Sequence, residues 1–578
     1  MRLLTSILLL LLAACAVQDN ASQRRLVTLT IIGTNDVHGT LLPKEMNGGL
    51  AAFSGYVAAV RAARAADGGA VLLIDAGDMW QGSLESNLVE GRTVVDIYNA
   101  LGYTAATIGN HEFDFGPVGA AAIPTGSSDD PRGALRQRIR EATFPVLSAN
   151  IVYRETGELI DWDNVSPSVM VEAAGIKVGI IGLVTADAFK VTIAANTVGL
   201  EIAPLADAIV REATSLREQG ADIVIVTAHA GSRCTEFGDP QDLSSCDPGG
   251  EIVQVANALP AGLVDHIVAG HVHRGMAHII NGIAVTSSFS NTYAFDRVDF
   301  SIDQDSGRVI ERKVFPPQVN CPAIGRASGE CAWLETDPAL VRPASYEGRP
   351  VEPMASVEAI VASAAAHAAA IKAEPLGVTL TSAIDLEGNP ESPLANLFTD
   401  AVLAGVDADV AIHNVSGGIR AILPAGELTY GKVYEISPFD NRVAIVEVSG
   451  AGLRRLIATE AMKQGRRAGF AGMRVFIGCA NGTPQVEMVL NNGHTIADDD
   501  PVRIVSNDFL VTLGDGVLTP AMPPGGFQYA DDPRLTRDLL VEWFRKRGGS
   551  LSAADFSTEA EPRWNFTDSF IAQCQHGI

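Results

Sequence analysis

Short apolar runs in the first half of the chain are each followed by a polar cluster. The runs are rich in β-branched residues and have the length of a buried strand. They span residues 27–32, 71–74, 223–226 and 266–269, with 105–108 as a weaker candidate. Because ligands in open α/β layers collect outside the carboxyl ends of the strands, five such strands could direct their polar ends to one place. The pattern therefore predicts an α/β domain with a site at its strand ends.

The clusters after these runs combine carboxylate, amide and imidazole side chains. They are Asp36-Val37-His38, Gly77-Asp78, Gly109-Asn110-His111-Glu112, His229 and Gly270-His271-Val272-His273. This mixture suits Mn²⁺, Zn²⁺, Fe or Co²⁺ better than the all-oxygen shell of Ca²⁺. A single Asp at a strand end is usually a turn or capping residue, and a lone His is more often a hydrogen-bonded scaffold residue. The ordered set, rather than any one member, predicts a centre for two metal ions.

The order of these clusters resembles the calcineurin-like metallophosphoesterases, and the stretch from Gly109 to Gly116 resembles the bacterial 5′-nucleotidase and UDP-sugar hydrolase family. The resemblance implies a ligand set of Asp36, His38 and His273 for one metal, Asn110, His229 and His271 for the other, and Asp78 as a bridge. A shared carboxylate lets two cations lie close together. Such a centre supplies a nucleophile for in-line attack on phosphorus at neutral pH.

The histidine after the metal-binding asparagine receives a different role from the same resemblance. His111 would point at the phosphoryl group, and Asp114 would orient the imidazole by hydrogen bonding. The alternative for Asp114 is that it caps a helix after Phe113. We therefore predict His111 and Asp114 as the catalytic pair.

Length and charge restrict the class of protein. A chain of 578 residues is too long for one ordinary core, so two domains are expected. Hydrophobic residues make up 47% and charged residues 19%, which is typical of a globular protein. The net charge of −26, without a basic stripe, argues against nucleic acid as the partner. Metal ions and local arginines would have to provide the positive potential that a phosphate needs.

The N-terminus has the features of an export leader. Arg2 supplies a positive charge, residues 3–12 form an apolar region, and Leu12-Ala13-Ala14-Cys15 is typical of a bacterial lipobox. The apolar stretch is too short for a membrane span. We predict an exported protein, in the periplasm or at the cell surface, anchored through lipid on Cys15. Ordinary signal cleavage near Ala14 or Ala16 is the alternative.

The cysteine count is consistent with export. The chain has seven cysteines, and the six other than Cys15 can form disulfides in an oxidising compartment. Fifteen connectivities are possible. Local spacing favours Cys234 with Cys246 and Cys321 with Cys331, which leaves Cys479 with Cys574.

Composition also suggests where the domains divide. Residues 316–353 are irregular and carry Pro, Gly and two Cys, and residues 357–372 form an Ala-rich run with strong helix propensity. We predict a leader and tether at 1–25, a catalytic domain at 26–350, a linker helix at 351–375 and a substrate-binding domain at 376–578. The helix could equally be the first helix of the second domain.

Motifs in the second half resemble the nucleotide-binding domain of the same family. They are Ser416-Gly417-Gly418-Ile419-Arg420, Ser437-Pro438-Phe439-Asp440-Asn441, Asn507-Asp508-Phe509 and Leu513-Gly514-Asp515-Gly516. The resemblance implies that Phe439 and Phe509 sandwich a base, that Asp515 accepts ribose hydroxyls and that Arg420 grips the substrate. The alternative is that both Phe residues belong to the core.

Two positions depart from the family pattern. Pro390 and Glu391 stand where the family usually has an Arg before a helix, and Val415-Ser416 replaces the usual Asn-Asn. Asn414 could compensate, although a shift of one residue on a strand turns a side chain to the other face.

The sequence thus predicts an α/β protein with an N-terminal calcineurin-like metallophosphoesterase β-sandwich flanked by helices and a second α/β nucleotide-binding domain. The predicted activity is release of phosphate from nucleotides by a centre of two divalent metals, with 5′-nucleoside monophosphates as the first candidates. The alternatives are hydrolysis of UDP-sugars, 2′,3′-cyclic nucleotides or thiosulfate esters. A catalytically silent surface binding lipoprotein is the alternative from another class. The oligomeric state is left open.

Overall fold

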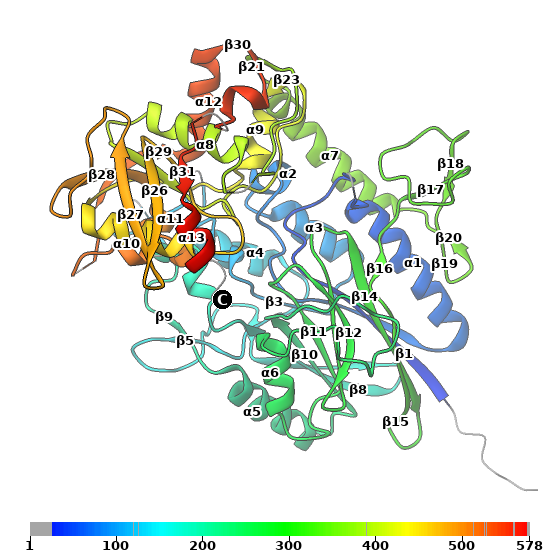
Figure 1. Ribbon diagram of the computed structural model, residues 1–578. Coiled ribbons are helices and arrows are strands. Elements are labelled where there is room, and N and C mark those ends of the chain that lie inside the picture. The colour runs from blue at the N-terminus through cyan, green and yellow to red at the C-terminus, as the bar shows by residue number, and fades with distance from the viewer. Residues whose placement is uncertain are drawn as a thin grey trace, which may run out of the picture.

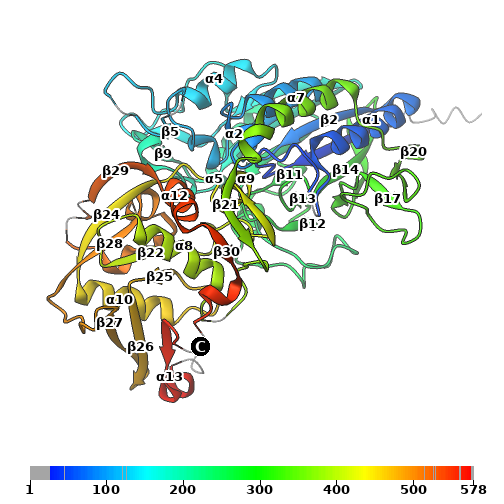
Figure 2. The ribbon, with the colours of Figure 1, turned by 90° about the horizontal axis from the view of Figure 1, so that it is seen from above.

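The computed structural model describes residues 26–574 except for positions 45, 120, 125, 389, 513, 525, 528, 559 and 560, and residues 529–533 are described by backbone alone. The leader and the lipid-anchor prediction at Cys15 lie outside the described residues. Two lobes are visible, one from the first half of the chain and one from its last third (Figures 1 and 2). Among the helices described, none has the length and apolarity needed to span a bilayer.

The first lobe contains two large sheets. The strands of one sheet, in spatial order, are β15 (Arg308–Val314), β14 (Ala294–Asp303), β1 (Leu26–Thr34), β2 (Ala70–Asp75), β3 (Ala105–Thr107), β4 (Val146–Leu147) and β6 (Val165–Ser166), with β16 (Gln318–Val319) beside β14. Those of the other are β12 (Gly275–Ile280), β13 (Ile283–Ser288), β11 (His266–Ala269), β10 (Ile223–His229), β8 (Ile176–Val184) and β7 (Ser168–Ala173). The strands that precede the polar clusters are parallel to one another within each sheet, β1 to β2 and β2 to β3 in the first and β10 to β11 in the second. On its other side β1 pairs antiparallel with β14.

Apolar side chains fill the space between these sheets. Leu29 and Ile31 of β1 lie in one buried cluster with Ile180 of β8 and Ile225 of β10. Alternate residues of a strand face opposite sides of its sheet, so Ile32 belongs instead to the cluster on the outer face. This double burial explains why the strands read as continuous apolar runs.

Helices cover the outer faces of the two sheets. The first sheet packs against α1 (Gly49–Asp67), α3 (Arg92–Leu101) and α4 (Gly133–Glu141). The second sheet packs against α5 (Leu205–Glu218) and α6 (Glu251–Ala258). The lobe is therefore a β-sandwich between two helical layers, as the sequence predicted (Figure 1).

A long helix runs between the lobes. The Ala-rich segment forms α7 (Ala355–Lys372), which contacts α1, α3 and the short α2 (Leu84–Asn87) on one side and α9 (Tyr430–Ile436) of the second lobe on the other. Before it come the strand pairs β17 (Ala323–Gly325) with β18 (Val341–Pro343) and β19 (Ser345–Tyr346) with β20 (Arg349–Pro350). Helix α7 thus belongs to the contact between the lobes.

The second lobe is also α/β. Its five-stranded sheet has the order β25 (Gly469–Ala471), β22 (Val410–His413), β28 (Pro501–Asn507), β24 (Arg442–Ser449) and β29 (Tyr529–Leu535). Two smaller sheets contain β27 (Thr483–Leu490), β26 (Met473–Ala480) and β31 (Trp564–Phe566), and β23 (Gly426–Thr429), β21 (Pro375–Leu380) and β30 (Gly549–Leu551). The main helices are α8 (Pro393–Ala404), α10 (Gly450–Ala461), α12 (Thr536–Arg547) and α13 (Asp568–Gln573).

The predicted disulfides are confirmed. Cys234 pairs with Cys246, Cys321 with Cys331, and Cys479 with Cys574. The last bond joins β26 to the residue after α13 and so closes a segment of 95 residues within the second lobe. Closing a loop of that length restricts the unfolded chain strongly.

Candidate metal centre and substrate cleft

The polar clusters of the first lobe meet where parallel strands of both sheets end. Asp36 follows β1, Asp78 follows β2, and Asn110 follows β3. His229 is the last residue of β10, and the His271–His273 segment follows β11. The carboxyl ends of strands from two packed sheets therefore supply all seven predicted ligands.

One group of nitrogen and oxygen atoms is formed by Asp36, His38 and His273. The Nε2 atoms of His38 and His273 are 3.0 Å apart. His273 Nε2 also lies 3.3 Å from Asp36 Oδ1. One potential ligand atom from each residue lies within 4.8 Å of the others, so a single ion could contact all three.

A second group lies beside the first. His229 Nε2 and His271 Nδ1 are 3.0 and 3.1 Å from Asn110 Oδ1 and 3.2 Å from each other. Asp78 Oδ2 is 3.1 Å from His229 Nε2 and 4.0 Å from His38 Nε2. The Asp78 carboxylate thus lies between the two groups, where a bridging ligand would have to be.

Backbone carbonyls set the direction of two imidazole rings. His38 Nδ1 donates to the carbonyl oxygen of Gln81 at 2.9 Å, and His229 Nδ1 donates to that of Ala76 at 2.8 Å. Each bond fixes the tautomer that leaves Nε2 free to coordinate. The donor atoms present therefore fit a pair of divalent ions.

Several ligand residues adopt a backbone conformation that is unfavourable for a residue with a side chain. Asp36, His38, Asp78, His271 and His273 all have φ between 49° and 76°. Each such residue costs on the order of 1 kcal/mol or more and persists only where its surroundings determine it. The dense hydrogen bonding around these loops is consistent with that requirement.

Glu112 is a buried carboxylate to which the sequence analysis assigned no role. Its two carboxylate oxygens accept hydrogen bonds from the backbone amides of Asp78, Met79 and Gly109 at 2.7 to 2.9 Å. Glu112 therefore ties the loop that carries Asp78 to the loop that carries Asn110. Its place in the Gly-Asn-His-Glu motif was the only signal in the sequence.

Burial and mutual contacts shift the protonation of these side chains. Burial raises the pKa of Asp36, but His273 outweighs it and brings the pKa to about 2. Burial also raises the pKa of Asp78, and the opposing effect of His229 and His111 holds it well below its ordinary value. Burial lowers the pKa of His38 well below its ordinary value and that of His271 to about 4. Burial lowers the pKa of His229, but Asp78 outweighs it and raises the pKa to about 10. Ionised carboxylates and neutral imidazoles are the forms that bind metals, so His229 would have to release a proton when an ion binds.

His111 and Asp114 form a separate pair at the edge of this centre. His111 Nδ1 lies 2.6 Å from Asp114 Oδ2, and the Thr192 hydroxyl donates to the other Asp114 oxygen at 2.9 Å. Burial lowers the pKa of His111, but the carboxylates of Asp114 and Asp78 outweigh it and raise the pKa to about 9. His111 can therefore be protonated at neutral pH. Thr192, which holds Asp114 in place, gave no signal in the sequence.

The metal-ligand loops form one wall of a cleft of about 870 Å³, and the second lobe forms the other. Arg420, Phe439, Phe509 and Asp515 all line this cleft, together with Asp78, Asn110, His111 and His271. The ring of Phe439 is stacked near His111, with 5.8 Å between centroids, and Arg420 lies over Phe439 at 5.6 Å. The structure thus brings the predicted substrate residues and the predicted metal ligands to one cavity.

Both Phe residues are only partly buried. A side chain added at Gly514 would come within 2.4 Å of the Phe509 ring, so glycine is needed for that close contact. Asn414, a possible replacement for the altered Asn-Asn pair, donates from Nδ2 to Asp515 Oδ2 at 2.5 Å and lines the same cleft. Asn414 therefore faces the site and supports the carboxylate of Asp515.

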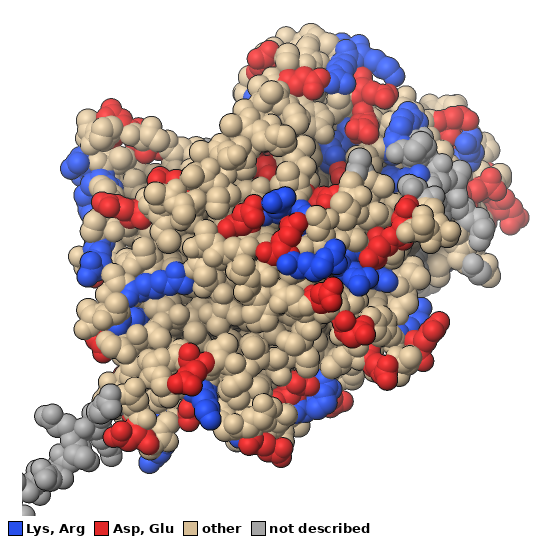
Figure 3. All heavy atoms as spheres, turned by 180° about the vertical axis from the view of Figure 1, so that it is seen from behind, with Lys and Arg blue, Asp and Glu red and all other residues tan. Residues whose placement is uncertain are grey.

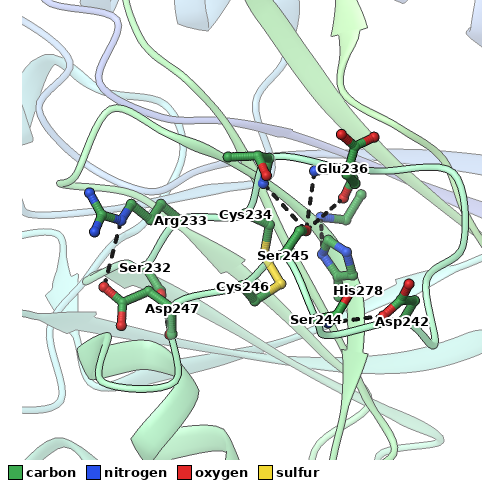
Figure 4. The surroundings of a disulfide bond; sticks show 12 residues. Ser232, Arg233, Cys234, Glu236, Asp242, Ser244, Ser245, Cys246, Asp247 and His278 are labelled. Atoms are coloured by element: carbon green, nitrogen blue, oxygen red, sulfur yellow. Dashed lines mark hydrogen bonds and ion pairs between the residues drawn. A yellow bond between two sulfur atoms is a disulfide. The ribbon is translucent and has the colours of Figure 1, made fainter.

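A third group of possible ligand atoms is formed by Cys234, Cys246 and His278. Figure 4 shows His278 beside the bond between the two sulfur atoms. Because both thiols are consumed in the disulfide, they are not available as thiolate ligands. The disulfide instead holds a loop near the Arg233–Asp247 ion pair.

Surface charge does not mark a binding face in the view from behind. Figure 3 shows Asp and Glu side chains interspersed with Lys and Arg over that surface. The cationic groups lining the cleft include Arg274, Arg420 and Arg466. An anionic substrate would find its positive partners inside the cleft.

Each lobe contains a segment that matches a known protein family. Residues 29–275 match the calcineurin-like phosphoesterase family, and residues 370–522 match the 5′-nucleotidase C-terminal domain. The cell wall protein Lmo0130 of Listeria monocytogenes is 26% identical over 85% of this chain, which spans 64% of that protein's length. The 5′-nucleotidase of Vibrio cholerae is 26% identical over 84% of this chain and 85% of its own.

The fold is also found in solved structures. A crystal structure of a 5′-nucleotidase precursor from Thermus thermophilus superimposes with a TM-score of 0.68, at 23% identity, over 94% of this chain and 99% of that one. Calcineurin-like phosphoesterases bind divalent metals, and the clustered side chains described above provide candidate sites for them. The chain thus combines a segment that matches the calcineurin-like phosphoesterases with a later segment that matches the 5′-nucleotidase C-terminal domain.

Proposed function

We propose that this protein releases phosphate from nucleotides and that 5′-nucleoside monophosphates are its first substrates. The observation that carries the proposal is that one cleft is lined by metal-ligand side chains and by two partly buried Phe residues, Phe439 and Phe509. A phosphate has partners on one wall of this cleft and a flat heterocycle has partners on the other. The relative from Vibrio cholerae that is named a 5′-nucleotidase gives independent support.

The proposed centre holds two divalent ions, of Mn, Zn, Co or Fe. Asp36, His38 and His273 hold one ion, Asn110, His229 and His271 hold the other, and Asp78 bridges them. When bound, the pair supplies Lewis-acid stabilisation of the phosphoryl oxygens and a nucleophile at neutral pH. The short contacts within the two groups support this division.

The remaining roles belong to residues around the metal ligands. His111 donates a proton or hydrogen bond from Nε2 to the phosphoryl group, and Asp114 holds the ring through Nδ1. Arg420 binds anionic oxygen through its guanidinium, and Asp515 accepts ribose hydroxyls. Phe439 and Phe509 stack on the base from the two sides. Residues 26–350 then act as the catalytic domain and 376–578 as the substrate-binding domain, with 351–375 between them.

We also propose that the protein is exported and anchored at Cys15. Three disulfides support an oxidising compartment. The relative from Listeria is named a cell wall protein. Intact-mass analysis of the mature protein tests this: we expect a lipid-modified N-terminus at Cys15, and an unmodified N-terminus beyond that residue would contradict it.

One experiment tests the substrate class. Hydrolysis by the metal-loaded protein is measured as phosphate release from nucleoside 5′-monophosphates and an aryl phosphate, and as sulfate release from a thiosulfate ester. With 2′,3′-cyclic nucleotides the ring-opened monophosphate is measured, and with UDP-glucose the products UMP and glucose 1-phosphate. We expect kcat/KM to be highest for a nucleoside 5′-monophosphate. Faster hydrolysis of another substrate would assign that activity instead, and no turnover of any of them would favour a binding protein.

A further inference from the structure

The loop that carries Phe439 lies in the contact between the two lobes. It follows α9, and its Phe439 ring is stacked near the His111 ring of the first lobe. The position of this aromatic side chain therefore depends on how the second lobe is held against the first. The hydrogen bonds of this loop show how it is held.

Three consecutive carbonyl oxygens of the loop accept hydrogen bonds from alternate sides. Those of Ser437 and Phe439 both accept from Nη1 of Arg537, each at 3.0 Å. That of Pro438, between them, accepts from Gln81 Nε2 at 3.2 Å and from Asn87 Nδ2 at 3.4 Å. Arg537 belongs to the second lobe, whereas Gln81 and Asn87 belong to the first. Donors from the second lobe, the first lobe and again the second lobe thus bind the three successive carbonyl oxygens of the loop.

The hydrogen bonds from Arg537 to the loop lie within the second lobe. Arg537 is almost fully buried on α12, its Nη2 contacts Asp440 Oδ1 at 2.5 Å, and its guanidinium lies over the Tyr434 ring at 4.5 Å. These contacts satisfy the charge and fix the shape of the loop. They do not determine its distance from the metal centre.

The hydrogen bond from Gln81 to Pro438 joins the first lobe to the second. The backbone carbonyl of Gln81 accepts the hydrogen bond from Nδ1 of His38, a predicted metal ligand, and its buried side chain donates to Pro438. One residue therefore contacts a metal ligand through its backbone and the Phe439 loop through its side chain. Asn87 supports it by donating to the Tyr434 hydroxyl at 2.6 Å.

We propose that Gln81 is a positioning residue that holds the Phe439 ring at its working distance from the metal centre and thereby favours substrates that carry a base. The proposal rests on the proposed nucleotide function. A phosphate ester without a base uses the metal centre and Arg420 and makes no use of the Phe439 ring. Gln81 therefore acts on the choice of substrate through the loop, without touching the substrate itself.

The test is Gln81→Met, which keeps the length of the side chain and removes its donor while leaving the backbone carbonyl for His38. The measured quantity is the ratio of kcat/KM for AMP to kcat/KM for an aryl phosphate. Gln304→Met is the matched control, because Gln304 Nε2 donates to the carbonyl oxygen of Ala174, away from the cleft. Asn87→Leu removes the second, partly buried donor to Pro438 and serves if Gln81→Met does not fold.

We expect Gln81→Met to lower the ratio by about five- to tenfold, mainly through KM for AMP, as loss of one buried hydrogen bond would predict. Asn87→Leu should lower it in the same direction and Gln304→Met should leave it unchanged. An unchanged ratio in both Gln81→Met and Asn87→Leu overturns the proposal. Equal losses for both substrates also overturn it, because they indicate general damage rather than a displaced loop.

Hydrogen exchange of the amides in residues 437–441 provides a readout that does not depend on nucleotide turnover. In metal-loaded Gln81→Met these amides should exchange faster than in the wild type and in Gln304→Met. If the wild type does not hydrolyse nucleotides, the proposed function fails, and the exchange measurement still tests the contact. Exchange equal to that of the wild type would show that Gln81 does not hold the loop.

Discussion

The candidate metal-ligand residues and the two Phe residues proposed as an aromatic wall line one cleft, but they are positioned in different ways. The ligands of the centre follow strands of a double sheet, and Asp36, Asp78 and His229 are almost fully buried. The proposed aromatic wall consists of Phe439, which follows α9, and Phe509, which lies in the short helix α11 (Asp508–Val511), and both remain partly exposed. The first region is fixed within one domain, whereas the second depends on the contact between two.

Because of this difference, the two regions are suited to different roles. Strand ends held by buried hydrogen bonds keep ligand atoms in place at the cost of strained backbone, which suits chemistry that every substrate shares. Loops at a domain contact can change with little effect on that chemistry, which suits the choice of substrate. We therefore expect changes in the metal centre to abolish activity and changes in the wall to alter specificity.

The largest effect should follow Asp78→Ala. Without the bridging carboxylate two cations lose the negative charge between them, so the bound metal should fall below two ions per chain and kcat should drop by at least about 10³-fold. Metal analysis after desalting, together with phosphate release, tests this. Two retained ions in an active Asp78→Ala protein would show that the two groups of ligands do not need the bridge.

A smaller loss is expected for His111→Ala. This change removes a catalytic group and no metal ligand, so both ions should stay bound while kcat falls by roughly 10²–10⁴-fold for AMP and aryl phosphate alike. Asp114→Asn should lower kcat less, because the imidazole remains and only its orientation is loosened. Metal analysis is the control, and loss of an ion from His111→Ala would make His111 a ligand.

Phe509→Ala should affect one substrate class only. Stacking of a base on an aromatic ring contributes about 1–3 kcal/mol, so KM for AMP should rise roughly five- to 150-fold while the aryl phosphate is hydrolysed almost as before. A Phe needed only for packing would leave a cavity and lower the melting temperature together with both activities. Equal losses would therefore remove Phe509 from the substrate site.

The smallest effect on activity is expected when a buried carboxyl group of the first lobe, that of Asp296, is replaced. Burial raises the pKa of Asp296, on β14, to about 7. The native protein then holds a proton that the unfolded chain releases near pH 4, so the contribution of Asp296 to stability declines as the pH rises from about 4 to 7. Asp296→Asn should flatten this decline and leave kcat unchanged. Thermal unfolding at pH 5 and pH 8 tests it, and an equally steep decline in the variant would contradict it.

The sequence signalled the candidate metal ligands more clearly than the other residues that line the cleft. The runs before Asp36 and Asp78 are mostly buried on both faces of their strands, so they are rich in apolar and β-branched residues and are followed by polar ones. The order of the clusters along the chain then carried the resemblance to a family. The disulfide pairing could also be predicted from the sequence, because two of the bonds join cysteines that are close in sequence.

Other parts of the site gave little signal. Glu112 binds backbone amides from two loops, and Thr192 binds Asp114 across 78 residues of sequence. Hydrogen bonds of this kind depend on where loops lie, and any polar residue of suitable size could have been in either place. Helix α7 was predicted as a linker, but only the structure shows that it packs against helices of both lobes.

The sequence by itself determined the strands, the order of the candidate ligands and the presence of a second domain, because these follow from local apolar periodicity and from residue types at strand ends. The tertiary structure alone decided that the ligands of two different sheets converge and that His111 lies near Phe439. It also decided that Gln81 contacts both the metal-ligand loop and the second lobe. These are contacts between residues distant in the chain, and the packing of preformed layers, rather than local preference, brings them together.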